Sequence, residues 1–382
     1  MGRFGLAACL IPTAVYLVMK TGQFFLDKKR KISNHCFARN VLIVFAVYDV
    51  MHYEFSWPVI VLPFVFEIGI EILHRCGLSL DPYENKIINC YSWFDTIIRS
   101  KKMGNTLDMT EGKYDGCFLK SYESAQKDQR NWILDQGRVE KGVRVLDIGS
   151  GNGNLLEMVK ERGGTAKGIT LSPEQQLFCR SKGMDVDLMN VWNLDENYFG
   201  RYDVLILNGS LEHFVNASDS FHNRKEKKYR RLFGLLAKLF DPDSAIKRIV
   251  ITCIHMDRPL RDYRLTDLIQ GYLYGQSYGG GLQVGRNGLV KYADDFEVLF
   301  QEDHTLDYYI SSKEYWRRVN GGNRERAIII KCLKRYPLFL INDPYFVHKL
   351  LHQLLGSWTW QFTPPHPPNC HQWIVLRKKT AG

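Results

Sequence analysis

Residues 143–154 read Val-Arg-Val-Leu-Asp-Ile-Gly-Ser-Gly-Asn-Gly-Asn, and this stretch decides the fold. Its apolar part, 145–148, has the composition of a buried parallel strand, and Gly149, Gly151 and Gly153 follow at once. A helical pattern of apolar residues begins directly after the last glycine. The order strand, glycine turn, helix places backbone N–H groups at the carboxyl edge of a sheet, where a nucleotide-like ligand can approach closely. The stretch therefore predicts an α/β domain with a ligand site at this turn.

The end of the next predicted strand, 165–170, separates the classes of nucleotide-binding fold. Dinucleotide enzymes place an acidic residue about 20 residues downstream of the first strand, where it binds a ribose hydroxyl. In this chain Thr170 stands at the strand tip, followed by Leu171 and, four residues later, Gln175. The missing acid argues against an NAD enzyme and against the commoner methyltransferases.

These segments resemble the cyclopropane fatty-acid synthase family, with its mycolic-acid and sphingolipid methyltransferase relatives. The second strand of that family ends in Gly-Val/Leu-Thr-Leu-Ser-x-x-Gln, and Thr170 and Gln175 match it. The resemblance covers roughly residues 113–378 and is strongest over 143–214. It implies an α/β fold with a Rossmann-like seven-stranded methyltransferase sheet, helices on both faces, and S-adenosylmethionine as the cofactor.

The resemblance also implies which residues bind the cofactor. In the family, Asp147 would orient the glycine loop, and Trp192 would border the adenine ring, with ordinary packing as the alternative for Trp192. Ser150 and Asn152 replace the family's usual Cys and Trp, but the glycines are retained. The predicted cofactor-binding residues are Asp147, Gly149, Ser150, Gly151, Gly153, Thr170, Leu171, Gln175, Trp192 and Asn208.

The fourth predicted strand, 202–207, runs into Asn-Gly-Ser-Leu-Glu-His-Phe. A Glu-His pair at the carboxyl end of a strand lies where open α/β sheets carry out chemistry. The alternative is an acid that favours a helix N-terminus through the helix dipole. The resemblance assigns Glu212 a catalytic role and leaves His213 open between function and structure.

A bicarbonate ion is the second bound group that the resemblance implies. Residues like Glu212, His255 and Tyr309 would hold it, together with the backbone of Cys117. This chain has one extra residue between the tyrosine and Cys117, so a small buried thiol is the alternative there. The nine cysteines are scattered without a Cys-x-x-Cys pair, which predicts a reduced protein with no metal site.

The chain is predicted to divide into residues 1–102, with membrane-associated helices and a linker, and a methyltransferase domain over 103–382. Residues 4–19 are apolar and extend to the length of about 20 residues that crosses a bilayer, although a cleaved signal peptide is the alternative. Residues 41–73 fit either a hairpin that dips into the membrane or a helical cap on the enzyme. The polar stretch 100–113 predicts the linker into the domain.

The net charge of +10 predicts an acidic partner surface. Residues 224–231 carry a basic cluster, which fits a solvated helix face or a contact with anionic lipid headgroups. No Asn/Asp-Pro-Pro-Tyr-type motif follows the fourth strand, which argues against methylation of nucleic acid. The basic loop at 28–31 predicts a membrane-associated protein with its catalytic domain facing the cytoplasm.

Together these features predict a membrane-anchored methyltransferase that uses S-adenosylmethionine to modify the double bond of a lipid acyl chain. The membrane anchor supports this prediction independently, because such a substrate is dissolved in the bilayer. An amine N-methyltransferase of the same fold is one alternative. A membrane adaptor that kept the fold without the chemistry is the other.

Overall fold

A computed structural model describes residues 108–215, 219, 224–256, 289–320 and 359–379, together with Ile87, Ile88, Cys90, Tyr91, Phe94, Asp95 and Ile98. The chain divides into two compact units, Met1–Cys90 with Arg326–Leu355, and Tyr91–Glu325 with Gly356–Gly382. The description that follows concerns the second unit. The predicted anchor and hairpin lie outside the described residues, and no helix in the described part is long and apolar enough to cross a membrane.

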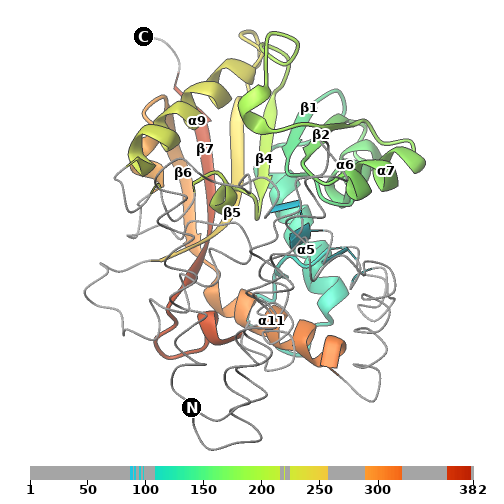
Figure 1. The fold of residues 1–382 in the computed structure, drawn as a ribbon, viewed down its shortest axis with the longest axis vertical. Helices are drawn as coiled ribbons and strands as arrows, with labels where there is room; N and C mark the ends of the chain where they lie inside the picture. Colours follow the sequence, from blue (N-terminus) through green and yellow to red (C-terminus); the bar gives the residue numbers. More distant parts are fainter. Residues whose placement is uncertain are drawn as a thin grey trace, which may run out of the picture. The chain divides into compact units, whose positions relative to one another are not determined.

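A seven-stranded sheet forms the centre of this unit, as predicted (Figure 1). The strand order is β3-β2-β1-β4-β5-β7-β6, in which β7 runs antiparallel to both of its neighbours and the first five strands are parallel. The strands are β1 Arg144–Ile148, β2 Thr165–Thr170, β3 Val186–Leu188, β4 Val204–Asn208, β5 Arg248–His255, β6 Phe296–Asp303 and β7 Cys370–Lys378.

Helices connect most of these strands in the described part of the chain. The α-helices are α5 Tyr122–Gln136, α6 Asn154–Glu161, α7 Pro173–Ser181, α9 Lys225–Leu239 and α11 Thr305–Asn320. Short 3₁₀ turns are η1 Val191–Asn193, η2 Leu211–His213, η4 Val290–Tyr292 and η5 Thr359–Phe362. The sequence predicts a helix over 123–135 at the start of the domain, and α5 confirms it.

Both faces of the sheet are covered by helices, as the apolar runs of the parallel strands require. Successive side chains of a strand point to opposite faces. Leu146 and Ile148 of β1 accordingly share an apolar cluster with α9, whereas Val145 belongs to the cluster that contains residues of α5 and α6. In Figure 1, α9 lies on one side of the sheet and α5, α6 and α7 lie on the other. Because β1, β2 and β4 are parallel, their carboxyl ends lie at the same edge of the sheet, and the glycine turn follows β1 at this edge.

Candidate active site

The glycine loop follows β1 in a conformation that glycine adopts without strain. The φ angles of Gly149, Gly151 and Gly153 are 92°, 54° and 81°, all in the left-handed region. The backbone N–H groups of Gly149 and Ser150 donate to the carbonyl of Ile169 at 2.9 and 3.0 Å, which ties the loop to β2. A Cβ added at Gly151 would meet no atom within 4 Å, so this glycine lies on the open side of the loop.

Buried polar atoms beside this loop fit a polar ligand. Asp147 is 2% exposed, and within the described part of the chain its Oδ1 and the hydroxyl of Ser150 have no hydrogen-bond partner. Buried polar groups in proteins are normally paired, so these two atoms call for a ligand or ordered water. Burial raises the pKa of Asp147 to about 7. The loop residues are thus consistent with the predicted cofactor site.

The end of β2 brings together the two residues that carried the family resemblance. The hydroxyl of Thr170 donates to Oε1 of Gln175 at 2.8 Å, and both residues are buried. Ser172 fixes this geometry, because its hydroxyl accepts from the backbone N–H of Gln175 at the N-cap of α7. Leu171, between them, is half-buried.

Trp192 lies in η1 after β3, half-buried against the apolar core. Its backbone N–H donates to the side chain of Asn190 at 3.0 Å, and the guanidinium of Arg231 lies 5.1 Å from the ring centroid. The ring therefore has packing contacts of its own, and its role beside adenine stays a prediction.

Glu212 lies in η2, directly after β4, and is 9% exposed. Oε2 of its carboxyl group has no hydrogen-bond partner within the described residues. Burial, helped by the nearby Glu111 carboxyl, raises the pKa of Glu212 to about 8. This side chain is a buried acid that can hold or release a proton near neutral pH.

His255 ends β5, the strand that pairs with β4, and is also buried, 1% exposed. Its Nε2 lies 3.1 Å from the sulfur of Cys370 on β7. His213 follows Glu212 and meets the hydroxyl of Tyr91, 2.7 Å from its Nε2. The structure thus places Glu212 and His255 at the ends of neighbouring strands, whereas His213 contacts the segment that precedes the domain core.

Cys117 and Tyr309 are the other two residues predicted to hold bicarbonate. Cys117 is exposed in a surface turn, and the extra residue before it adds to that turn. Tyr309 is half-exposed on α11 and contacts the ammonium of Lys313, 5.3 Å from its ring centroid. Among the described contacts, none joins Cys117 or Tyr309 to Glu212 or His255. Adjacent residues on a helix point in different directions, and the tyrosine that faces inward is Tyr308.

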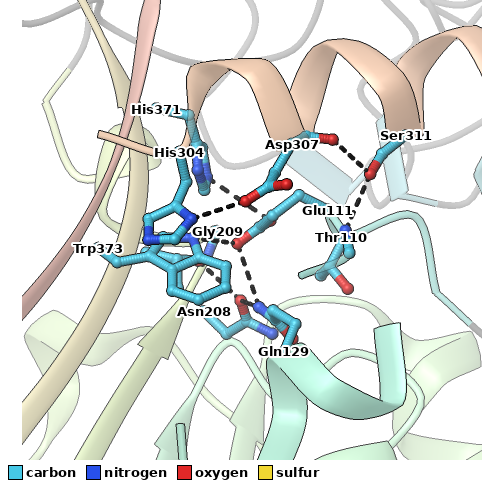
Figure 2. A network of polar contacts seen from close by, with 12 residues as sticks. Thr110, Glu111, Gln129, Asn208, Gly209, His304, Asp307, Ser311, His371 and Trp373 are labelled. Atoms are coloured by element: carbon cyan, nitrogen blue, oxygen red, sulfur yellow. Dashed lines mark hydrogen bonds and ion pairs between the residues drawn. The ribbon is translucent and has the colours of Figure 1, made fainter. Parts of the chain in front are cut away.

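A buried acid that the sequence analysis did not identify lies behind this edge of the sheet. Glu111 is 1% exposed, and its Oε1 accepts hydrogen bonds from Nε2 of Gln129 at 3.1 Å and from Nε1 of Trp373 at 2.9 Å (Figure 2). Its Oε2 lies 3.5 Å from Nε2 of His371. Burial raises the pKa of Glu111 to about 7. The end of the stretch predicted as a linker, 108–113, is therefore built into the domain.

The Glu111 network reaches Asn208, a predicted cofactor residue at the end of β4. Nε2 of Gln129 also donates to Oδ1 of Asn208 at 2.9 Å, and the hydroxyl of Thr252 donates to the same oxygen at 2.7 Å. Thr252 in turn accepts from the backbone N–H of Gly209 at 3.1 Å. No sequence motif marks Gln129 or Thr252, because each looks like an ordinary residue of a helix or a strand.

Helix α11 and His304, the residue before it, also contact this network (Figure 2). The ring of His304 stacks on Trp373 with centroids 3.6 Å apart, and its Nδ1 lies 2.7 Å from Oδ2 of Asp307. The backbone N–H of Gly112 donates to the hydroxyl of Ser311 at 2.8 Å. These contacts hold the segment that carries Glu111 between α11 and the sheet.

Solved structures share this fold. A cyclopropane synthase, MmaA2 of Mycobacterium tuberculosis, superimposes with a TM-score of 0.60 at 15% identity, over 78% of this chain and 100% of that chain. The mycolic acid cyclopropane synthase CmaA1, complexed with SAH and CTAB, gives a TM-score of 0.59 at 16% identity, over 78% of this chain and 99% of that chain. At such identities the likeness concerns the fold alone.

Sequence comparison points to the same family. The chain is 27% identical over 159 residues to the tuberculostearic acid methyltransferase UfaA1 of Mycobacterium tuberculosis, which is 40% of this chain and 34% of the relative. It is 34% identical over 94 residues to the cyclopropane-fatty-acyl-phospholipid synthase of Escherichia coli, 24% of each chain. The match thus spans about a third or less of the length of these relatives.

The family model described as mycolic acid cyclopropane synthetase matches residues 118–339. This match confirms the resemblance that Thr170, Gln175 and Glu212 indicated, and with it S-adenosylmethionine as the cofactor of the family. Because the matched residues are more than half of the 382, the chain belongs to the mycolic acid cyclopropane synthetase family of S-adenosylmethionine-dependent methyltransferases.

Proposed function

We propose that this protein methylates the double bond of a lipid acyl chain with S-adenosylmethionine, giving a cyclopropane ring or a methyl branch. One structural observation carries the proposal within the family: the buried carboxyl group of Glu212, with an oxygen that has no partner among the described residues, at the carboxyl end of β4. The names of the relatives, a tuberculostearic acid methyltransferase and a cyclopropane-fatty-acyl-phospholipid synthase, support an acyl chain as the acceptor.

The cofactor, when bound, supplies a methyl group that its sulfonium has already activated. The residues of this chain have to align the acceptor and handle the charge that follows. The glycine loop and the Thr170–Gln175 pair would hold the cofactor at the ends of β1 and β2. Transfer of the methyl group to the double bond leaves a positive charge on the acyl chain, and a proton must leave to close a ring. Glu212, with a pKa of about 8, is suited to accept that proton in its ionised form.

Bicarbonate at the active site belongs to the same proposal. Of the residues predicted to hold it, Glu212 and His255 lie at neighbouring strand ends, and both are buried. No contact among the described residues joins Cys117 or Tyr309 to these two side chains, so their part in holding the ion stays a prediction. We therefore expect Glu212 to accept the proton from the methylated acyl chain, whether or not bicarbonate is bound.

We also propose that the protein works at a membrane, with its catalytic domain on the cytoplasmic side. The support comes from the sequence: the apolar stretch 4–19, the basic loop 28–31, and a substrate that is dissolved in the bilayer.

Lipid mass spectrometry of cells that express the wild-type chain or the E212A variant tests the proposed reaction. We expect a gain of one CH₂ unit on unsaturated acyl chains in the wild type and its loss in the variant. E212Q is the matched control for volume, and it should fail as well, because it cannot accept a proton. An unchanged acyl profile, with S-adenosylhomocysteine still bound by the purified protein, would exclude acyl chains and favour an amine acceptor. A protein that binds no cofactor would fit the inactive adaptor.

A further inference from the structure

Every hydrogen bond between Glu111 and Asn208 has a fixed direction. The indole nitrogen of Trp373 can only donate, so Oε1 of Glu111 must accept from it. The same oxygen accepts from Nε2 of Gln129. The second hydrogen on that nitrogen goes to Oδ1 of Asn208. Only an amide nitrogen can satisfy both acceptors, so Gln129 cannot be reversed without breaking two hydrogen bonds.

The orientation of Asn208 follows from this chain of bonds. Its Oδ1 accepts from Gln129 at 2.9 Å and from the hydroxyl of Thr252 at 2.7 Å. Thr252 donates here because an amide oxygen can only accept, and the oxygen of its hydroxyl in turn accepts from the N–H of Gly209. The amide nitrogen of Asn208 therefore points away from the network and donates to no group among the described residues. Asn208 itself is only half-buried, so this nitrogen can meet a ligand at the end of β4.

Protonation of Glu111 does not reverse the direction of the hydrogen bonds from Glu111 to Asn208. Burial raises the pKa of Glu111 to about 7, so both forms are present near neutral pH. Oε1 already accepts two hydrogen bonds, and a proton would sit on Oε2, which lies 3.5 Å from Nε2 of His371. Asn208 presents its amide nitrogen in either state.

The position of Asn208 indicates which part of the cofactor it meets. Asp147 of β1 pairs with Ile206 of β4, so Asn208 lies two residues beyond that pair, level with the start of the glycine loop. Two residues further on, Ser210 packs on that loop, with its hydroxyl bonded to the carbonyl of Ile148 at 2.6 Å. The amino-acid end of S-adenosylmethionine carries an ammonium and a carboxylate. The unpaired oxygen of Asp147 suits the ammonium, and the N–H donors of Asn208 suit the carboxylate.

We propose that Glu111 is a positioning residue that acts through Gln129, holding the amide of Asn208 so that it donates to the amino-acid carboxylate of S-adenosylmethionine. This inference deepens the proposed function and rests on it for the cofactor. It goes beyond the residues that the family resemblance assigns, because Glu111 and Gln129 are not among them.

Exchanging the residues at positions 111 and 129 tests the direction of these hydrogen bonds. In E111Q/Q129E, the residue volumes and the net charge are preserved, and the hydrogen-bond chain can re-form. A carboxylate at position 129 can only accept, however, so Asn208 must turn its nitrogen inward and its oxygen toward the cofactor. The matched control is E111Q, which keeps an acceptor oxygen for Gln129 and Trp373. N208D removes the donor directly and leaves the rest of the network in place.

The readout is the Kd of the full-length protein, by isothermal titration calorimetry, for S-adenosylhomocysteine and for 5′-methylthioadenosine, which lacks the amino-acid end. We expect E111Q to bind S-adenosylhomocysteine within about threefold of the wild type. E111Q/Q129E and N208D should bind it about tenfold more weakly, as the loss of a charge-assisted hydrogen bond predicts. The Kd of 5′-methylthioadenosine should not change in any variant.

Two results would overturn the proposal: an exchanged variant that binds S-adenosylhomocysteine as tightly as E111Q, or an equal loss for both ligands. If circular dichroism shows that the exchanged variant is unfolded, Q129E takes its place, because a carboxylate at position 129 can likewise only accept from Asn208, and its Kd values for the two ligands are compared with those of N208D. A wild-type protein that binds neither ligand would instead refute the proposed function. A wild type that binds the cofactor but forms no lipid product leaves this test intact, because the test does not depend on the acceptor.

Discussion

At the scale of single residues, the glycines of the loop after β1 serve different purposes. A Cβ added at Gly149 would lie 2.7 Å from the Cβ of Ser210, and one added at Gly153 would collide with the sulfur of Met184. Gly151 has the same left-handed backbone but open space around it. The outer glycines are therefore required by packing, whereas Gly151 leaves room for what the loop binds.

G151A should weaken cofactor binding more than it weakens the fold. The left-handed backbone costs an alanine about 1 kcal/mol, and the new methyl group would also occupy the open side of the loop. G183A is the matched control, because Gly183 has a φ of 71° and equally open surroundings in the turn before β3. Both variants should lose similar stability in urea, but only G151A should bind S-adenosylhomocysteine more weakly, by about tenfold. Equal Kd values for the two variants would contradict this account.

The buried acid Glu212 makes stability depend on pH. Its pKa is about 8 in the folded protein and near 4.5 when exposed, so the folded state binds more protons between these values. Stability is therefore greatest below the unfolded pKa and falls as the pH rises toward 8. E212Q has no ionisable group at this position and so loses this pH dependence. The free energy of unfolding of E212Q minus that of the wild type should therefore rise between pH 5 and 8.5, by on the order of 3 kcal/mol.

Urea unfolding of both proteins at pH 5, 7 and 8.5 measures the effect. The other buried carboxyl groups, Glu111 and Asp147, titrate in both proteins and largely cancel in the difference. A constant difference between wild type and E212Q across this range would show that Glu212 is not held neutral by burial.

At the scale of elements, the segment before the domain core contacts the glycine loop that follows β1. Tyr91, Phe94, Asp95 and Ile98 are helical at spacings of three and four, which places them on one helix face. Nδ2 of Asn152, in the glycine loop, donates to Oδ1 of Asp95 at 3.1 Å, and both residues are buried. This face therefore helps to fix the loop.

A double-mutant cycle with D95A and N152A measures that contact. We expect a coupling free energy of about 0.5–1.5 kcal/mol, the net value of a typical intramolecular hydrogen bond. D95A should also increase amide hydrogen exchange in the loop over 149–153. Additive effects and unchanged exchange would mean that the helix face does not hold the loop.

Helix α11 holds the segment of Glu111 through Ser311. The neighbouring Ser312 offers a close control, because both serines are buried and both donate to a backbone carbonyl of their own helix, at 2.8 and 2.7 Å. Only Ser311 also accepts, from the N–H of Gly112. S311A should therefore destabilise the protein by about 1–2 kcal/mol more than S312A, because it leaves a buried donor unpaired. Thermal unfolding of the two variants provides the comparison, and equal losses would argue against the contact.

At the scale of the whole molecule, the charge of +10 is concentrated in part on α9. Arg224 and Lys228 pair with the buried Asp219, which assigns them a structural role. Lys227 and Arg231 are exposed and are the residues of this helix best placed to meet an anionic surface.

The full chain should bind vesicles that contain phosphatidylserine, and the binding should weaken with salt. K227Q/R231Q should reduce the affinity by roughly thirtyfold, at about 1 kcal/mol for each of the two charges near the surface. K141Q/K182Q removes the same charge from exposed positions away from α9 and serves as the control. Equal losses in both double variants, measured by co-sedimentation, would indicate a response to net charge rather than to this helix.

The sequence by itself determined the domain fold and the residues of the candidate site that follow β1, β2 and β4. The strand over 165–170, the glycine turn and the pair Thr170 and Gln175 were readable because their signals are local, within a few residues of one another. Glu212 was found for the same reason, since it follows a recognisable strand directly.

Only the tertiary structure decided that Glu111 is buried in the network behind the site. Its partner Trp373 is 262 residues away in sequence, and Gln129 reaches Asn208 across 79 residues. A glutamate in a polar stretch carries no local sign of burial, because burial depends on which distant segments pack over it. The same reason explains why the sequence did not show that Tyr308, rather than Tyr309, is the buried tyrosine of α11. Helix spacing is visible in the sequence, but the strands and turns that pack against α11 determine which of its faces is buried.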